Sequence, residues 1–184
     1  MPTKTKNLVL AGKHIFLRPP VLADQKEYMA QLQQSLRVSR WLGNPFTGKR
    51  RFADYVKPSK DGGYFRFFIF RNEDGRLVGS IGLFMIERKA LQSGTTGYLV
   101  GAPYVRRGYA TEALQLILRF AFRRLKLHRI EANIQPGNVA SIALVKRAGF
   151  KREGYSPRYV KIRGRWRDHE RWAILVENWR KNPQ

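Results

Sequence analysis

The hydrophobic pattern of the chain changes its period near residue 110, and this change limits the folds open to it. From residues 110 to 125, apolar side chains recur at the spacing of one helix face, at Leu114, Ile117, Leu118, Ala121, Phe122 and Leu125. The segments on either side of this helix, "TTGYLVG" and "HRIEANIQ", have the composition of short strands. A strand, a helix and a strand in succession therefore predict a mixed α/β domain around one sheet.

Further segments extend this pattern toward both ends of the chain. The sequence predicts helices over residues 22–36 and 51–56, and strands at residues 14–17, in "YFRFFIF" and in "RLVGSIGLFMI". Between the last two, "RNEDGR" carries the Asp-Gly pair of a hairpin turn. Asn138 suits the N-cap of a helix that runs to Ala148, and Gly149 suits the left-handed position after it. "RYVKIRGRWRDHERWAILV" predicts two strands joined at Arg163-Gly164.

The length and composition favour one domain. The chain has 184 residues, of which 43% are hydrophobic, and no repeat or linker divides it. We expect a single domain over residues 1–184, with an ordered core over residues 12–180. The absence of cysteine excludes a disulfide framework, a cysteine zinc cluster and a cysteine nucleophile. No run approaches the ~20 apolar residues of a membrane span, and no targeting pattern is present, so we expect a cytoplasmic protein without membrane contact.

The charge of the chain is the outlying number. With 36 Lys and Arg against 13 Asp and Glu, the formal net charge is +23. A positive field of this size attracts phosphates and repels polycations, so we expect the protein to work on or near something anionic, such as nucleic acid. A basic surface that serves only solubility is the alternative.

The segment "YVRRGYATEAL", residues 104–114, places two arginines and a glycine at the start of the predicted central helix. The first N–H groups of a helix lack partners and carry a partial positive charge, which together form an anion site. Gly108 lets the backbone approach a ligand closely, and Arg106 and Arg107 add positive charge. Two other interpretations stay open here: a nucleic-acid patch, and a plain helix start in which Glu112 complements the helix dipole.

A second helix start, "NIQPGNVASIALVKRAGFKREG", follows the first along the chain. Together with "IFLRPPVLAD", "RLVGSIGL" and "YVKIRGRWRDHERWAIL", the two helix starts occur in a familiar order over nearly the whole sequence. The chain in this respect resembles the GNAT superfamily of acetyl-CoA-dependent N-acetyltransferases, and within it the RimJ/RimL-type enzymes that acetylate ribosomal-protein N-termini. The resemblance implies an α/β fold with a mixed, mostly antiparallel central sheet flanked by helices.

The resemblance also implies acetyl-CoA as cosubstrate and no metal. It places the pyrophosphate on the backbone amides of residues 106–111, and the pantetheine arm along a strand that splays from its neighbour. The implied cofactor-binding residues are Leu99, Val100, Arg106, Arg107, Gly108, Tyr109, Ala110, Thr111, Asn138 and Ser141. The chain departs from the superfamily at Val105, where Gln or Arg is frequent. Because backbone amides do most of the holding, this departure is compatible with binding.

Ser141 and Glu131 are the candidate catalytic residues. The resemblance puts Ser141 at the position proposed to donate a proton to the departing thiolate, although an ordinary first-turn serine would look the same. By strand alternation Glu131 shares one face with Asn133 and Gln135, and it can hold a water that acts as base. A structural ion pair with an arginine is the alternative for Glu131 and for a second carboxylate candidate, Glu153.

No strong general base is apparent in the sequence, and this bears on the choice of substrate. Val160 stands where a relative has a glutamate base on the penultimate strand. A peptide α-amine has a pKa of ~7.7–8.0 and a lysine ~10.4, so the α-amine is already partly neutral at pH 7. We therefore expect a protein N-terminus as acceptor, in particular that of a ribosomal protein near ribosomal RNA, and an enzyme that is a monomer or a homodimer.

Three other possibilities are weighed against this one. Polyamines and aminoglycosides are acceptors elsewhere in the superfamily, but a +23 chain would repel them. A non-catalytic RNA-binding protein of the same fold would bind RNA and transfer nothing. A catalytic triad through Asp168 and His169 is excluded because adjacent strand residues point to opposite faces, so both are expected to be structural. Trp166 and Trp172 are expected in the core or a pocket wall.

Overall fold

The structure is a computed structural model that describes residues 8–41, 43, 46 and 51–181. Its strands are β1 (Leu10–Ala11), β2 (Ile15–Arg18), β3 (Phe65–Arg71), β4 (Leu77–Glu87), β5 (Ser93–Val100), β6 (Arg129–Ile134), β7 (Lys151–Ile162) and β8 (Arg165–Leu175). Its α-helices are α1 (Gln25–Val38), α2 (Phe52–Tyr55), α3 (Tyr109–Arg119), α4 (Val139–Arg147) and α5 (Val176–Lys181). Two 3₁₀ turns, η1 (Leu22–Asp24) and η2 (Ala102–Tyr104), and one π-helical turn, η3 (Phe120–Arg124), complete the described elements.

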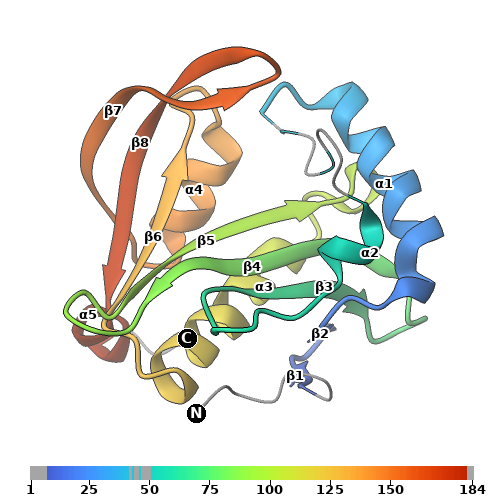
Figure 1. Cartoon of the computed structure of the whole chain (residues 1–184), viewed down its shortest axis with the longest axis horizontal. Coiled ribbons are helices and arrows are strands. Elements are labelled where there is room, and N and C mark those ends of the chain that lie inside the picture. Colours follow the sequence, from blue (N-terminus) through green and yellow to red (C-terminus); the bar gives the residue numbers. More distant parts are fainter. Residues whose placement is uncertain (1–7, 42, 44–45, 47–50, 182–184) are drawn as a thin grey trace.

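The strands form one sheet in the order β1-β2-β3-β4-β5-β6-β8-β7 (Figure 1). Neighbours pair antiparallel except β5 and β6, which are parallel. A parallel pair needs a crossover connection, and α3 provides it, so the change of hydrophobic period at residue 110 marks the topological centre of the fold. β7 is an edge strand of the sheet.

Helices cover both faces of the sheet, which explains why β3 and the first half of β4 are buried along almost their full length. On one face, α3 buries Leu114, Ile117 and Leu118 against the strands, and α4 extends the same core. On the other face, α1 and α2 form a mostly aromatic cluster in which the ring of Tyr28 stacks on Phe68 with centroids 4.4 Å apart. In Figure 1, α3 passes behind the sheet while α1 and α2 lie in front of it.

The predicted mixed, mostly antiparallel sheet flanked by helices is confirmed, as are its local signals. Gly75 in the β3–β4 turn and Gly149 after α4 have positive φ, +66° and +90°. Asn138 caps α4, where its side chain accepts a hydrogen bond from the Ser141 N–H. Within the described residues, no helix is long and apolar enough to cross a membrane.

Three features differ from the prediction. The helix predicted to reach residue 125 leaves α geometry after Arg119 and continues as the π-helical turn η3. Phe120, Ala121 and Phe122 are all buried in this turn. β7 begins at Lys151, earlier than its alternation indicates, and the short α5 carries no strong helix signal.

Candidate active site

The parallel pair at the centre of the sheet opens partway along its length. β5 and β6 pair from Ser93 opposite Arg129 to Thr95 opposite Glu131, where the recorded pairing ends. On its other side, β5 stays paired with β4 as far as Val100. Beyond this point β5 and β6 diverge, and Figure 1 shows the V-shaped opening between them, called here the V. Among the described residues, the edge of β5 at Leu99 and Val100 that faces the V therefore has no strand partner, so its backbone groups are available to a ligand.

The connection from β5 to α3 has the backbone shape expected of an anion-binding loop. Arg106 and Gly108 both have positive φ, +63° and +82°, and Gly108 is the N-cap of α3. The recorded backbone bonds of the first turn begin at Thr111, whose N–H donates to the Gly108 carbonyl over 3.0 Å. The earlier N–H groups of the helix start thus point outward. A Cβ at Gly108 would meet no atom within 4 Å, so conformation, not space, favours glycine there.

Basic side chains surround this helix start. Arg106 and Arg107 are exposed, and Arg107 lines a cavity of about 360 Å³ together with Lys13, His14, Arg71, Asn72, Glu73 and Tyr109. Glu112 does not simply face the helix dipole, because its Oε1 accepts a 2.9 Å hydrogen bond from the His14 N–H. Its Oε2 lies 3.1 Å from His14 Nδ1. The carboxylate of the first turn is thereby held by the β1–β2 connection.

The start of α4 lies across the V from β5. Asn138 Oδ1 accepts the Ser141 N–H over 3.3 Å, and the Tyr98 hydroxyl donates to the Ser141 carbonyl over 3.5 Å. Burial raises the pKa of the Tyr98 phenol, and its hydrogen bond with Ser141 opposes that rise in part. Tyr98 is therefore a neutral hydrogen-bond donor at neutral pH. The sequence analysis did not single out Tyr98, although alternation along β5 could have placed it on the α4 side.

The two candidate carboxylates share one arginine. Arg129 Nε donates to Glu131 Oε1 over 2.7 Å, and Arg129 Nη1 donates to Glu153 Oε1 over 3.0 Å, with a second bond from Nη2 to Glu153 Oε2. These bonds lower the pKa of Glu153 and hold it ionised. Both carboxylates thus make the structural pairs weighed as their alternative role. Whether Glu131 also holds a water stays a prediction.

Asn133 lies two residues farther into the V than Glu131. Its face of β6 alternates with the buried face formed by Ile130, Ala132 and Ile134. The Asn133 Oδ1 is buried and has no hydrogen-bond partner in the described part of the chain. A buried carbonyl oxygen without a partner costs free energy of about 1–3 kcal/mol, so an atom of this kind at an open edge indicates a position for a ligand donor.

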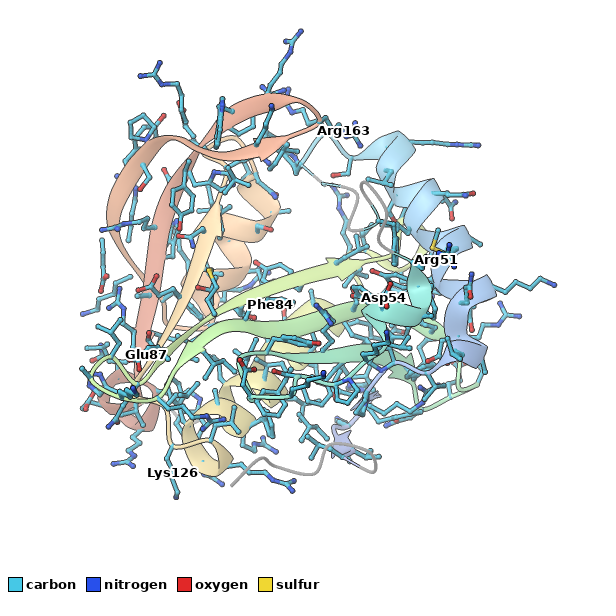
Figure 2. The ribbon with its side chains drawn as sticks, viewed as in Figure 1. Arg51, Asp54, Phe84, Glu87, Lys126 and Arg163 are labelled. Carbon is cyan, nitrogen blue, oxygen red and sulfur yellow. The ribbon has the colours of Figure 1, made fainter. Side chains whose placement is uncertain are left out.

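Hydrogen bonds link β6 and the β7–β8 hairpin, on one side of the V, to the end of α1 and the segment after it. Gln135 Nε2 donates to the Trp41 carbonyl over 3.1 Å, which ties the end of β6 to the segment after α1. Arg163, at the tip of the β7–β8 hairpin, donates from Nη2 to the carbonyls of Leu36 and Ser39, at 2.5 and 3.0 Å. Figure 2 labels Arg163 beside the end of α1. These contacts fix the position of the hairpin relative to the candidate site.

The residues of "RWRDHERW" have structural roles, with one correction. Asp168 accepts bonds from the Tyr155 hydroxyl and the Arg158 N–H, at 2.5 and 2.7 Å. Trp172 is buried, as predicted, but Trp166 is 59% exposed. The prediction that Trp166 lies in the core or a pocket wall is wrong because the hairpin extends beyond the helices that cover the rest of the sheet. No group of three His, Cys, Asp or Glu that could hold a metal occurs among the described residues.

A cavity of about 420 Å³ lies elsewhere, and it shares no lining residue with the V. Its walls come from the end of β2, from α2 and from the start of β3, at Pro19, Pro20, Val21, Leu22, Tyr55, Val56, Lys57, Pro58, Ser59, Tyr64, Phe65, Arg66 and Phe67. Size alone would select this cavity. The convergent polar groups and the free strand edge select the V.

Comparisons with known proteins place the chain among acetyltransferases. Residues 14–151 match the family described as "Acetyltransferase (GNAT) domain". The chain is 35% identical over 177 residues to the "Probable N-acetyltransferase YjcK" of Bacillus subtilis, covering 91% of this chain and 97% of that protein. It is 33% identical over 120 residues to the "[Ribosomal protein uS5]-alanine N-acetyltransferase" of Escherichia coli, covering 65% of this chain and 62% of that protein.

Solved structures show the same architecture. Mycobacterium smegmatis RimJ in complex with CoA-disulfide superposes with a TM-score of 0.80 at 29% identity, covering 96% of this chain and 87% of that one. The spermidine N-acetyltransferase of Vibrio cholerae, in complex with CoA and spermine, gives a TM-score of 0.76 at 21% identity, covering 91% of this chain and 99% of that one. At that identity the second likeness concerns the fold alone.

Proposed function

The chain belongs to the GNAT acetyltransferase family and is an acetyl-CoA-dependent N-acetyltransferase; from this premise we propose that it acetylates the N-terminal α-amine of a protein, in particular a ribosomal protein. The similarity to the uS5-alanine N-acetyltransferase of Escherichia coli supports this acceptor class. The pairing of both candidate base carboxylates with Arg129 supports it further.

We infer that coenzyme A lies across the V. The start of α3 offers outward N–H groups on a left-handed backbone, next to the exposed Arg106 and Arg107, which fits a pyrophosphate. The unpaired edge of β5 at Leu99 and Val100 would hold the pantetheine arm. Asn138, already bonded to the Ser141 N–H, keeps a free amide group for the same arm.

The transfer needs a neutral amine, a polarised thioester carbonyl and a proton for the leaving thiolate. Backbone N–H groups of β5 would polarise the carbonyl. Asn133 Oδ1 would accept an N–H of the attacking amine and orient its lone pair. As the C–N bond forms and the C–S bond breaks, the Ser141 hydroxyl would give its proton to the thiolate and take one back from water, while the amine would lose its proton to water. Tyr98 would position Ser141 through their hydrogen bond.

One observation carries the choice of acceptor: both candidate base carboxylates, Glu131 and Glu153, are bonded to Arg129. A carboxylate neutralised by an arginine is a weak base toward a lysine-like amine of pKa ~10.4, whereas an α-amine of pKa ~7.7–8.0 needs little help. A site that holds no free carboxylate among the described residues also offers little to a polyamine. The net charge of +23 opposes polyamine entry in the same way.

The experiment compares acceptors with the purified enzyme and labelled acetyl-CoA. One peptide has a free N-terminal Ala or Ser and no lysine; a second has the same sequence with a blocked N-terminus and one internal lysine; spermidine is the third acceptor. We expect transfer to the first peptide at least tenfold faster than to the other two. Faster transfer to spermidine would refute the proposal, and no transfer to any amine would favour a non-catalytic protein. Mass spectrometry of ribosomal proteins from cells with and without the gene would then identify the acceptor.

The role of Asn133 is tested in the same assay. Asn133→Ala is expected to lower kcat/KM for the peptide by about tenfold while leaving the KM for acetyl-CoA unchanged, since one hydrogen bond to the acceptor is removed. Asn133→Asp keeps an acceptor oxygen at that place and should recover part of the loss. Equal effects of both variants on acetyl-CoA binding would assign Asn133 to the cofactor instead.

A further inference from the structure

The outer half of the β7–β8 hairpin stands apart from the rest of the sheet. β7 is an edge strand, and from Ser156 to Arg167 most residues of both strands are exposed on both faces. The two strands turn at Arg163 and Gly164, whose positive φ values of +49° and +78° form a tight two-residue turn. This segment, called here the outer hairpin (residues 156–167), is covered by no helix, yet Arg163 anchors its tip to the end of α1.

The outer hairpin concentrates positive charge. Its twelve residues include five basic side chains and no acidic one, at Arg158, Lys161, Arg163, Arg165 and Arg167. Arg163 donates to backbone carbonyls. The side chains of Arg158, Lys161, Arg165 and Arg167 form no ion pair with any described residue. Five arginines elsewhere do pair with carboxylates of the described residues, at Arg18, Arg71, Arg76, Arg129 and Arg152. Within the hairpin, the positive charge of Arg158 helps to lower the pKa of Asp168. Lys161, Arg165 and Arg167 are thus three exposed cations without an ion pair among the described residues.

Large exposed rings accompany these cations. Trp166 is 59% exposed, and Tyr159 is 43% exposed with its ring edge against His169. Trp166 lies directly opposite Lys161 in the strand pairing, so the two side chains share one face of the ribbon. An exposed indole beside a lysine offers a flat apolar surface next to a positive charge. Because most of the indole is exposed, it contributes little to the packing of the core.

A bulge sets how the rings project. Ser156 pairs with His169 and Val160 pairs with Arg167, so three residues of β7 lie opposite Asp168 alone. Asp168 closes this bulge through its bonds from the Arg158 N–H and the Tyr155 hydroxyl. Bulges re-aim side chains, and Arg158 and Tyr159 within this one are both exposed. The display of charge and rings is thus held by specific hydrogen bonds and is not a loose strand end.

We propose that the outer hairpin binds single-stranded RNA, with Trp166 stacking on a base beside Lys161 on one face of the ribbon, and Arg165 and Arg167 contacting phosphates from the other face. Cations without internal partners match a phosphate backbone, and exposed rings match bases that are not stacked in a duplex. An acidic protein is the alternative occupant, and the test below separates it from RNA. The inference rests on the proposed function in one respect: with a ribosomal protein as acceptor, unpaired RNA of a ribosomal particle is the RNA within reach. Because Arg163 ties the hairpin to α1, bound RNA would lie beside the entrance of the V.

The test measures RNA binding without acetyl-CoA or amine, so its outcome is separable from that of the acetylation assay. The probe is a fluorescent single-stranded 12-nucleotide RNA, titrated by anisotropy from 50 to 300 mM salt. Arg165→Gln with Arg167→Gln removes two proposed phosphate contacts, and Arg119→Gln with Arg124→Gln removes two exposed arginines at the end of α3 and in η3 as a charge-matched control. We expect the first pair to reduce the slope of log K against log salt by about 1.4, and the control pair to change it little.

Trp166→Ala tests the stacking contact apart from the charge. It is expected to weaken RNA binding roughly 5- to 100-fold without changing the salt slope, and to remove the tryptophan fluorescence quenching that RNA causes. A duplex RNA of the same length should bind more weakly than the single strand, because its bases are not free to stack. Thermal unfolding of each variant, unchanged from the parent, shows that the hairpin is intact.

Several results would overturn the proposal. Equal losses from the hairpin pair and the control pair would mean that net charge alone attracts RNA. Binding that Trp166→Ala leaves unchanged would remove the stacking contact. An acidic peptide such as poly-glutamate that binds as tightly as RNA and displaces it would assign the hairpin to a protein partner. Peptide acetylation that fails while RNA binding follows the expected pattern would refute the proposed acceptor and leave this inference standing.

Discussion

Gly108 offers the sharpest test of how the enzyme holds acetyl-CoA. Its φ of +82° is a left-handed conformation, and a Cβ there would meet no atom within 4 Å, so a side chain is limited by backbone strain and not by a clash. Asn and Asp tolerate this conformation better than other side chains and are nearly the same size. The strain of Gly108→Asn should therefore raise the free energy of the binding conformation of the loop by about 1 kcal/mol. This weakens the affinity for acetyl-CoA roughly fivefold.

Gly108→Asp adds a negative charge to the same geometry. A carboxylate about 5 Å from one phosphate, at the effective dielectric constant of ~20 that describes charges near a protein surface, raises the free energy of the complex by about 3 kcal/mol. The Asp variant should thus bind acetyl-CoA more than about a hundredfold more weakly than the Asn variant. Arg106→Ala removes one exposed charge, worth about 0.2–1 kcal/mol, and should weaken binding no more than about fivefold.

Isothermal titration calorimetry with coenzyme A at two salt concentrations measures all three affinities. The gap between the Asp and Asn variants should narrow at high salt, because screening weakens the repulsion. Equal affinities of the Asp and Asn variants would mean that no phosphate lies near Gly108. A loss from Arg106→Ala as large as that from Gly108→Asp would mean that arginine side chains, and not backbone amides, hold the cofactor.

Four further outcomes follow from the contacts of the site and sheet. Ser141→Ala should lower kcat by about 10²-fold or more with little change in the KM for acetyl-CoA, as steady-state kinetics would show; unchanged kcat would make Ser141 a structural residue. Arg129→Gln releases both carboxylates and should raise the rate on a lysine peptide relative to an N-terminal amine; an unchanged ratio would place the carboxylates beyond reach of the acceptor. Gly79→Ala brings a Cβ within 2.2 Å of a β5 carbonyl and should destabilise the fold by about 1–3 kcal/mol in urea unfolding, whereas Gly43→Ala, whose Cβ would meet no described atom within 4 Å, should not. The bulge N–H holds the pKa of Asp168 below its usual value, so Asp168 stabilises the hairpin above about pH 4 and this contribution is lost as the pH falls through its folded pKa. The melting temperature of Asp168→Asn should accordingly lie below that of the parent at pH 7 and approach it at pH 3.

The parts of the fold that follow from short-range signals could be predicted from the sequence. The change of period at residue 110, the Asp-Gly turn before Gly75 and the cap at Asn138 each depend on a few neighbouring residues, and each is confirmed. The π-helical turn after Arg119 could not be read in this way. It depends on packing of Phe120 against two rings of β3, residues that lie more than fifty positions earlier in the chain.

The site shows the same division. The glycine and the helix start of the anion loop are local, so sequence reasoning could find them. The hydrogen bond from Tyr98 to Ser141 joins residues 43 positions apart, and the sharing of Arg129 between Glu131 and Glu153 joins three strand positions that no spacing rule connects. Trp166 was misjudged because large apolar residues are usually buried, and only the hairpin's position beyond the covering helices explains its exposure.

The high charge of the chain has different consequences in different places, and the places matter more than the total. Arg129 donates hydrogen bonds to Glu131 and Glu153, the carboxylates that could have served as bases. This pairing favours an acceptor that is already partly neutral at pH 7. In the outer hairpin, Lys161, Arg165 and Arg167 form no ion pair with the described residues and remain available to an external anion. The excess of basic residues thus accounts both for the weakness of the base and for the charge of the hairpin. Both agree with the proposed acceptor, a terminal amine presented beside an anion, as a protein N-terminus on an RNA particle would be.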